Sequence, residues 1–307
     1  MAAIIEPGRL EWGIQLPIQS QSTIYVQEWE ASAGPDELGR VAKACDEAGA
    51  FYVGVCDHIA IPQPHDEKMG GTWYDTIATL SWLAAQTSRT HLLSHVAVLP
   101  YRHPLMTAKA WNTLDRLSGG RAVLGVGAGH VEAEFDLLGL DFDRRGPDLD
   151  RSIAEVRRAF EQEVVDGAVS SPRPVRAGGP PIWVGGSSMP AMRRAARLGD
   201  GWLPQGPPKM GMRGAIEFIV NERSEHFGDD VAIDLGSFTE PIHVGTPDWE
   251  VGPHTASGTP DEIAERLRRY RKLGVSHLQP RFPSRSCDEL VEQLLRFGAE
   301  VWPLVVA

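Results

Sequence analysis

The sequence predicts an α/β protein whose core is a closed (β/α)8 barrel, or TIM barrel, with an insertion after the fourth strand. Short apolar segments alternate with amphipathic segments along the chain, which is typical of parallel strands joined by crossover helices. Eight such units can be counted, and no linker separates them. The length of 307 residues, 42% of them hydrophobic, suits such a barrel, so we expect a single domain spanning residues 1–307.

The predicted strands are short and mostly apolar throughout, as expected for strands that are buried on both faces. They lie at residues 12–16, 51–56, 92–99, 121–126, 182–185, 201–204, 231–235 or 238–244, and 275–279. The seventh strand therefore has two candidate segments. An open, doubly wound sheet is the alternative architecture, because periodicity does not show whether a sheet closes.

The predicted helices carry apolar residues at helical spacing and have recognisable ends. Leu38, Val41, Cys45 and Ala48 mark the first helix, and Gly49 ends it. Further helices are predicted at residues 77–84, 104–117, 149–160, 188–198, 212–227 and 260–273, with a last helix after residue 286.

The last two helices each begin with the pattern of a capping box, in which the N-cap side chain and a glutamate three residues later bond to each other's backbone amide. The two pairs are Thr259 with Glu262 and Ser286 with Glu289. Residues 130–147 fit no barrel element and form the predicted insertion.

Composition argues against several kinds of partner and cofactor. The net charge is -11, and no Lys/Arg cluster is interleaved with aromatics, so we expect no nucleic-acid partner. The three cysteines, Cys45, Cys56 and Cys287, are widely spaced without a CxxC, so neither a disulfide scaffold nor a metal site is expected. There is no secretory signal pattern and no apolar run of roughly 20 residues, which predicts a cytoplasmic protein without a membrane partner.

Barrel enzymes place their active sites at the C-terminal ends of the strands, so polar residues there are the candidates. The second strand ends in Asp57 and His58. Histidine suits proton transfer near neutral pH, and an adjacent carboxylate can orient it. The sequence leaves open the alternative that both residues cap the same loop.

Two further strand ends carry unusual residues. Ser94 and His95 interrupt the apolar third strand, which indicates either a bulge or a histidine satisfied inside the barrel. The fourth strand ends in a glycine-rich run made of Gly127, Ala128, Gly129 and His130. Its glycines either let a flat group approach the backbone or form a tight turn.

The ends of the fifth and eighth strands are candidates for binding phosphate. Gly185, Gly186 and Ser187 lie directly before a helix, where free amides attract anions. Ordinary helix capping is the alternative. Arg281 follows the eighth strand and is either a bidentate phosphate ligand or a solvated arginine.

Other barrel chemistries lack the residues they require. No lysine falls at a strand end, where a Schiff base would form, no HxH pair follows the first strand, and no GxSxG motif is present. We therefore expect a cofactor to carry the difficult chemistry.

Five motifs resemble those of the luciferase-like monooxygenase family, and above all its actinobacterial branch of coenzyme F420-dependent oxidoreductases. They are PYRHP at 100–104, TLDRLSGGR at 113–121, LGVGAG at 124–129, PIWVGG at 181–186 and GTPDE at 258–262. The resemblance continues in shorter stretches between them, such as Glu134-Phe135, and covers nearly the whole chain.

The resemblance implies a homodimer of barrels and assigns roles to particular residues. A non-proline cis peptide beneath the central ring of the cofactor would fall within Ser94, His95 and Val96. The Gly185–Gly186 pair would contact phosphate, and His58 would stand near the reactive carbon. Where some deazaflavin dehydrogenases carry an acidic glutamate, this chain has His130.

The leading hypothesis is hydride transfer between coenzyme F420 and a small organic substrate. His58, oriented by Asp57, would donate or accept the proton, with His130 as a second candidate. One alternative is an FMN-dependent monooxygenase that uses reduced flavin and oxygen. Another is a barrel that binds a cofactor without catalysis. The substrate itself cannot be deduced from the sequence.

Overall fold

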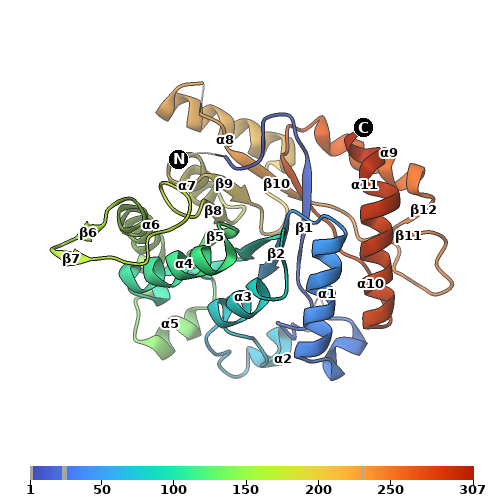
Figure 1. The fold of residues 1–307 in the computed structure, drawn as a ribbon, viewed down its shortest axis with the longest axis horizontal. Helices are drawn as coiled ribbons and strands as arrows, with labels where there is room; N and C mark the ends of the chain where they lie inside the picture. Colours follow the sequence, from blue (N-terminus) through green and yellow to red (C-terminus); the bar gives the residue numbers. More distant parts are fainter. Residues whose placement is uncertain (1–2, 23–25, 230) are drawn as a thin grey trace.

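The computed structural model describes residues 3–22, 26–229 and 231–307. Within them, eight parallel strands form a ring at the centre of the molecule (Figure 1). These strands are β1 (Glu11–Gln15), β2 (Tyr52–Val55), β3 (His91–Ser94), β5 (Ala122–Gly127), β8 (Ile182–Gly185), β9 (Gly201–Leu203), β10 (Asp234–Phe238) and β13 (His277–Gln279). The pairings run from β3 through β2, β1, β13, β10, β9 and β8 to β5, and β5 pairs in turn with β3, so the ring is closed and the predicted barrel is confirmed over the open sheet.

Two predicted strands differ in detail from the observed ones. The seventh barrel strand, β10, overlaps both candidate segments. The rest of the second candidate becomes β11 (Ile242–Val244), which pairs with β12 (Ala256–Gly258) in a separate sheet. The predicted third strand is divided into β3 and β4 (Ala97–Val98), and both parts pair with β5.

Helices surround the strands, as Figure 1 shows. The helices that match predicted ones are α1 (Pro35–Glu47), α3 (Thr76–Ala84), α4 (Pro104–Ser118), α6 (Arg145–Glu161), α7 (Met189–Leu198), α8 (Gly211–Phe227), α9 (Pro260–Arg271) and α10 (Cys287–Arg296). In α1, Leu38, Val41 and Cys45 are buried, as their spacing predicts. Gly49 follows with a φ of 79°, a left-handed conformation that ends the helix.

The two predicted capping boxes have different outcomes. In α9 the Thr259 hydroxyl accepts from the Glu262 amide, and the Glu262 carboxylate accepts from the Thr259 amide, so the box is confirmed. In α10 Ser286 caps the Glu289 amide, but the Glu289 carboxylate bonds to Arg285 and Trp249 instead. The second box is therefore only half formed.

The predicted insertion after the fourth barrel strand contains α5 (Glu132–Leu138) and the short helix η3 (Phe142–Arg144). Gly129 opens it with a φ of 84°, which turns the chain away from β5. The remaining short elements are η1 (Glu28–Ser32), α2 (Asp66–Met69), η2 (Leu99–Tyr101), β6 (Val164–Val165), β7 (Ala168–Val169), η4 (Phe297–Val301) and α11 (Trp302–Val306).

Side chains fill the interior of the barrel. One cluster of buried apolar residues there consists of Ile5, Tyr52, Leu93, Val123, Trp183 and Leu203. The indole of Trp183 stacks on His277 with ring centroids 4.4 Å apart, and its Nε1 donates to Asp234. Because the interior is packed, ligands are left to bind at the ends of the barrel.

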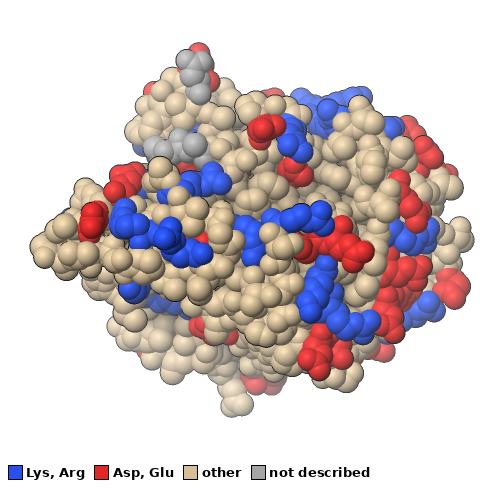
Figure 2. Space-filling model, in the orientation of Figure 1, with Lys and Arg blue, Asp and Glu red and all other residues tan. Residues whose placement is uncertain are grey.

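Three observations concern surface charge, membrane-spanning helices and the cysteines. Figure 2 shows both basic and acidic side chains on the face in view. Among the described residues, no helix combines the length and apolarity needed to cross a bilayer. The three cysteines are all buried and none forms a disulfide.

Candidate active site

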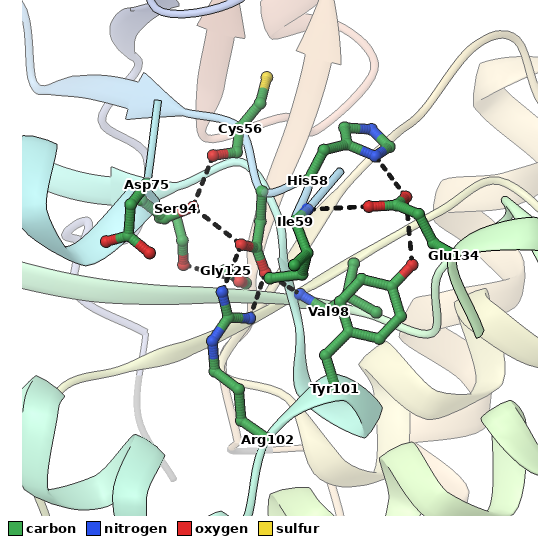
Figure 3. Close-up of polar contacts among 12 residues, drawn as sticks. Cys56, His58, Ile59, Asp75, Ser94, Val98, Tyr101, Arg102, Gly125 and Glu134 are labelled. Atoms are coloured by element: carbon green, nitrogen blue, oxygen red, sulfur yellow. Dashed lines mark hydrogen bonds and ion pairs between the residues drawn. The ribbon is translucent and has the colours of Figure 1, made fainter. Parts of the chain in front are cut away.

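The centre of the site is an ion-paired histidine at the mouth of the barrel, by which we mean the C-terminal ends of its strands. His58 follows β2, and its Nδ1 lies 2.7 Å from Oε2 of Glu134 on α5 (Figure 3). The His58 side chain is only 10% exposed and that of Glu134 is fully buried. The insertion therefore supplies the partner of the predicted catalytic histidine.

Glu134 is held by several donors at once. Its Oε1 accepts from the amides of Ile59, at 2.8 Å, and Ala60, at 3.3 Å. The Tyr101 hydroxyl donates to Oε2 at 3.3 Å. Burial alone would raise the pKa of Glu134, but the hydrogen bond and charge of His58, with the two amides, lower it overall. Glu134 is thus a carboxylate near neutral pH, and the buried carboxylate in turn raises the pKa of Tyr101 beyond the effect of burial.

Because an ionised carboxylate only accepts hydrogen bonds, the proton between His58 and Glu134 belongs to Nδ1 of the imidazole. Figure 3 shows the other ring nitrogen, Nε2, on the side away from Glu134. Neutral His58 therefore presents an unprotonated Nε2, which can accept a proton.

Asp57 has a different role from the one predicted. Its carboxylate forms a bidentate pair with Arg102, at 2.6 and 2.7 Å, and also accepts from the Val98 amide and the Thr76 hydroxyl. The prediction that Asp57 orients His58 is therefore wrong, since Glu134 holds the ring. Asp57 instead ties the end of β2 to the segment that follows the third barrel strand.

Two aromatic rings flank His58. The indole of Trp73 has its centroid 4.3 Å from that of His58, and His130 stands edge-on at 5.8 Å. Partial burial and the neighbouring His58 lower the pKa of His130, against a smaller opposing effect of Glu134. The structure thus brings His130 next to His58, as a second and neutral imidazole.

The predicted interruption of the third strand contains a cis peptide bond between His95 and Val96. Ser94 donates its hydroxyl hydrogen to the carbonyl of Gly125, at 2.7 Å. His95 is buried, its Nε2 lies 3.0 Å from Oε1 of Gln279, and burial lowers its pKa to about 4. The non-proline cis peptide implied by the resemblance is confirmed, and His95 is a neutral residue of the barrel interior.

The glycines at the mouth make room for Val96. A Cβ on Gly127 would stand 2.5 Å from Cγ2 of Val96, and one on Gly185 would stand 2.7 Å from its Cγ1. A Cβ on Gly129 would meet Phe135 and Val98. The half-buried Ala128 packs against the main core. These residues shape the floor of the mouth through close packing.

The residues predicted to bind phosphate lie directly before α7. Gly186 has a φ of 118°, and a Cβ there would clash with Ala191. The Ser187 hydroxyl donates to the carbonyl of Gly206 and accepts from the Gln205 amide, and Ser188 caps the helix. Ser187 therefore holds the loop after β9, and its side chain is not the helix cap.

Arg281 lies at the rim of a second part of the mouth. It lines a cavity of about 210 Å³ together with Gln15 and Ser20, at the ends of β1 and β13. Its positive charge lowers the pKa values of both Cys56 and His95, against or beside larger effects of burial. A larger cavity, about 530 Å³, lies at the opposite end of the barrel, where Leu10 and Leu235 line it.

Three residues of this site were absent from the predicted catalytic and binding residues: Glu134, Tyr101 and Arg102. Glu134 and Tyr101 both lie within stretches that carried the family resemblance. Neither was assigned a role, because each contacts a partner far away in the sequence; Glu134 is 76 residues from His58.

Comparison with known proteins places the chain in a family. The model of the luciferase-like monooxygenase family matches residues 10–248, which is most of the chain. The protein therefore belongs to the luciferase-like monooxygenase family, whose members are oxidoreductases, and the resemblance seen in the sequence is confirmed.

The three relatives described next share between 18% and 32% sequence identity with this chain. An uncharacterized protein of Mycobacterium tuberculosis is 32% identical over 185 residues, 54% of this chain and 64% of that protein, so the match spans less than two thirds of its length. An F420-dependent glucose-6-phosphate dehydrogenase of Microbacterium testaceum is 28% identical across 88% of this chain and 93% of its own. The structure of a monooxygenase from Streptomyces bottropensis superposes with a TM-score of 0.75 at 18% identity, covering 95% of this chain and 99% of that one, which shows a shared fold.

Proposed function

We propose that this protein transfers a hydride between coenzyme F420 and a small organic substrate, with His58 as the proton carrier. The observation that carries the proposal is the His58–Glu134 pair, which presents a bare Nε2 at the mouth of the barrel. The likeness over nearly the full length to an F420-dependent dehydrogenase supports the choice of cofactor. We further propose that the chain acts as one catalytic domain; its homodimeric assembly and cytoplasmic location stay predictions.

The residues at the mouth fit a flat cofactor with a phosphate tail. Gly127 and Gly185 at neighbouring strand ends carry no side chain and pack closely against Val96, which gives the mouth an apolar floor. Beside it, Gly186 leads into the N-terminus of α7, whose dipole favours an anion, although Pro190 has no N–H and the Ala191 amide donates to Ser188. These residues would hold the ring and the phosphate, respectively.

When bound, the deazaflavin accepts or donates the hydride. The protein must then manage the proton that accompanies it. In substrate oxidation, Nε2 of His58 accepts the proton of the substrate hydroxyl as the hydride, which carries the C–H electron pair, leaves the carbon. Glu134 stabilises the resulting imidazolium, and Tyr101 holds Glu134 in position. In the reverse direction the same imidazolium returns the proton to the carbonyl oxygen.

The proposal is tested by titrating the protein with F420 and, separately, with FMN, and following the fluorescence of each. We expect F420 to bind more tightly and to be reduced or oxidised when alcohols or ketones are supplied. Preferential FMN binding with oxygen consumption would contradict the proposal and support a flavin monooxygenase. Tight F420 binding without turnover over a broad panel would instead indicate a non-catalytic barrel.

A further inference from the structure

Aromatic and apolar side chains lie beside the His58 ring. Trp73 lies against the His58 ring, with a centroid separation of 4.3 Å and a tilt of 59°. His130 contributes its ring from β5's end, and Ile59 is 46% exposed next to His58. A substrate that reaches His58 from this side therefore meets ring faces and an aliphatic chain.

Trp73 is fixed in this position by the backbone. It forms a β-bridge with Ser20, which joins the loop after β1 to the loop after β2. Its Nε1 donates to the carbonyl of Gly70 at 3.1 Å, so the polar edge of the indole is bonded within its own loop. The Trp73 side chain is therefore held in place before a ligand binds, and its Nε1 hydrogen is already bonded. Ligand binding does not have to order this side chain.

The charged groups nearest His58 already have partners. Glu134 is engaged by His58, Tyr101 and two amides, and Asp57 is paired with Arg102. The lowered pKa of His130 keeps that ring neutral. An aromatic face is therefore the feature that Trp73 adds beside His58.

We propose that the substrate carries a flat aromatic group next to its reacting carbon, and that Trp73 selects for this group. The inference rests on the proposed function, because it places the reacting carbon near Nε2 of His58. Offset or edge-on packing of an aromatic ring against Trp73 is worth roughly a two- to tenfold gain in affinity over a saturated ring of the same size.

The test uses two pairs of ligands that differ only in aromaticity: acetophenone against cyclohexyl methyl ketone, and 1-phenylethanol against 1-cyclohexylethanol. Calorimetry on the protein loaded with F420 gives dissociation constants for the ketones, and kcat/KM is measured for the alcohols. We expect the wild type to prefer the aromatic member of each pair several-fold. Trp73→Ala should remove the preference, and Trp73→Phe, which keeps a ring, should retain most of it.

Trp82→Ala is the matched control, since Trp82 lies on α3 and packs against Gly39 of α1, outside the mouth. It should leave the preference unchanged. An equal affinity for both ketones in the wild type, or a preference that survives in Trp73→Ala, would overturn the inference. Aromatic preference in binding without turnover of any alcohol would instead contradict the proposed function and leave the aromatic site standing.

Discussion

Two buried carboxylates lie close to the end of β2, and their partners differ in whether they can gain and lose a proton. Asp57 is joined to the guanidinium of Arg102, which stays charged at any physiological pH. Glu134 is joined to the imidazole of His58, which can gain and lose a proton. A permanent pair can only hold structure, whereas a titratable pair can also move a proton. The residue adjacent to His58 in sequence is therefore the structural one.

The largest effect is expected from removing the titratable partner. His58→Ala should lower turnover by roughly 10²–10⁴-fold, because the substrate proton then has no acceptor at Nε2. Affinity for F420, followed by fluorescence, should change little, since His58 is separate from the floor made by Val96 and the glycines. Turnover within a few-fold of the wild type would contradict the assignment of His58.

The permanent pair should dominate stability. Asp57→Ala leaves Arg102 without its buried partner and frees the Val98 amide, so we expect the free energy of unfolding in urea to fall by about 3 kcal/mol. Asp166→Asn is the control, because Asp166 makes the same bidentate contact with Arg158 at an exposed site and asparagine tolerates its φ of 49°. It should leave stability nearly unchanged. Equal effects of the two substitutions would contradict the structural role of Asp57.

Glu134→Gln should affect turnover more than stability, which is the reverse of what we expect for Asp57→Ala. The amide keeps the size of the side chain but no longer stabilises the imidazolium, and we expect kcat to fall roughly ten- to hundredfold. Steady-state kinetics on folded protein would show this as a loss in kcat with little change in the binding of F420. A variant with normal kcat would show that His58 works without Glu134.

A smaller effect concerns pH. The pKa of Glu134 is lowered in the fold from its ordinary value of 4.5, so its ionised form is favoured by folding. Its contribution to stability is therefore present above pH 4.5 and is lost as pH falls through the lowered folded value. We expect the difference in unfolding free energy between wild type and Glu134→Gln to shrink over that acidic range. Urea titrations at several pH values would reveal a constant difference if this account were wrong.

The barrel could be predicted from the sequence because its signals are local. Apolar strands, helical spacing and a cap such as Thr259 each depend on neighbouring residues. The seventh strand was ambiguous because apolar residues on both sides of residues 236–237 match a strand, and pairing with β9 and β13 places the strand across the end of one candidate and the start of the other.

The active site was only partly predictable, for a physical reason. His58 and His130 follow from their places at strand ends. Asp57 was misassigned because consecutive residues of an extended chain point in opposite directions, so sequence neighbours need not touch. Glu134 could not be found by periodicity, since its contact with His58 depends on how the insertion folds back over the mouth.

The central claim is that Glu134, and not Asp57, fixes the proton on Nδ1 of His58. The most direct measurement is the ¹⁵N NMR shift of both ring nitrogens of His58 in its neutral form. The account predicts a protonated Nδ1 and a bare Nε2 in the wild type and in Asp57→Asn, and loss of this preference in Glu134→Gln. A protonated Nε2 in the wild type, or a tautomer that changes with Asp57 and not with Glu134, would contradict it.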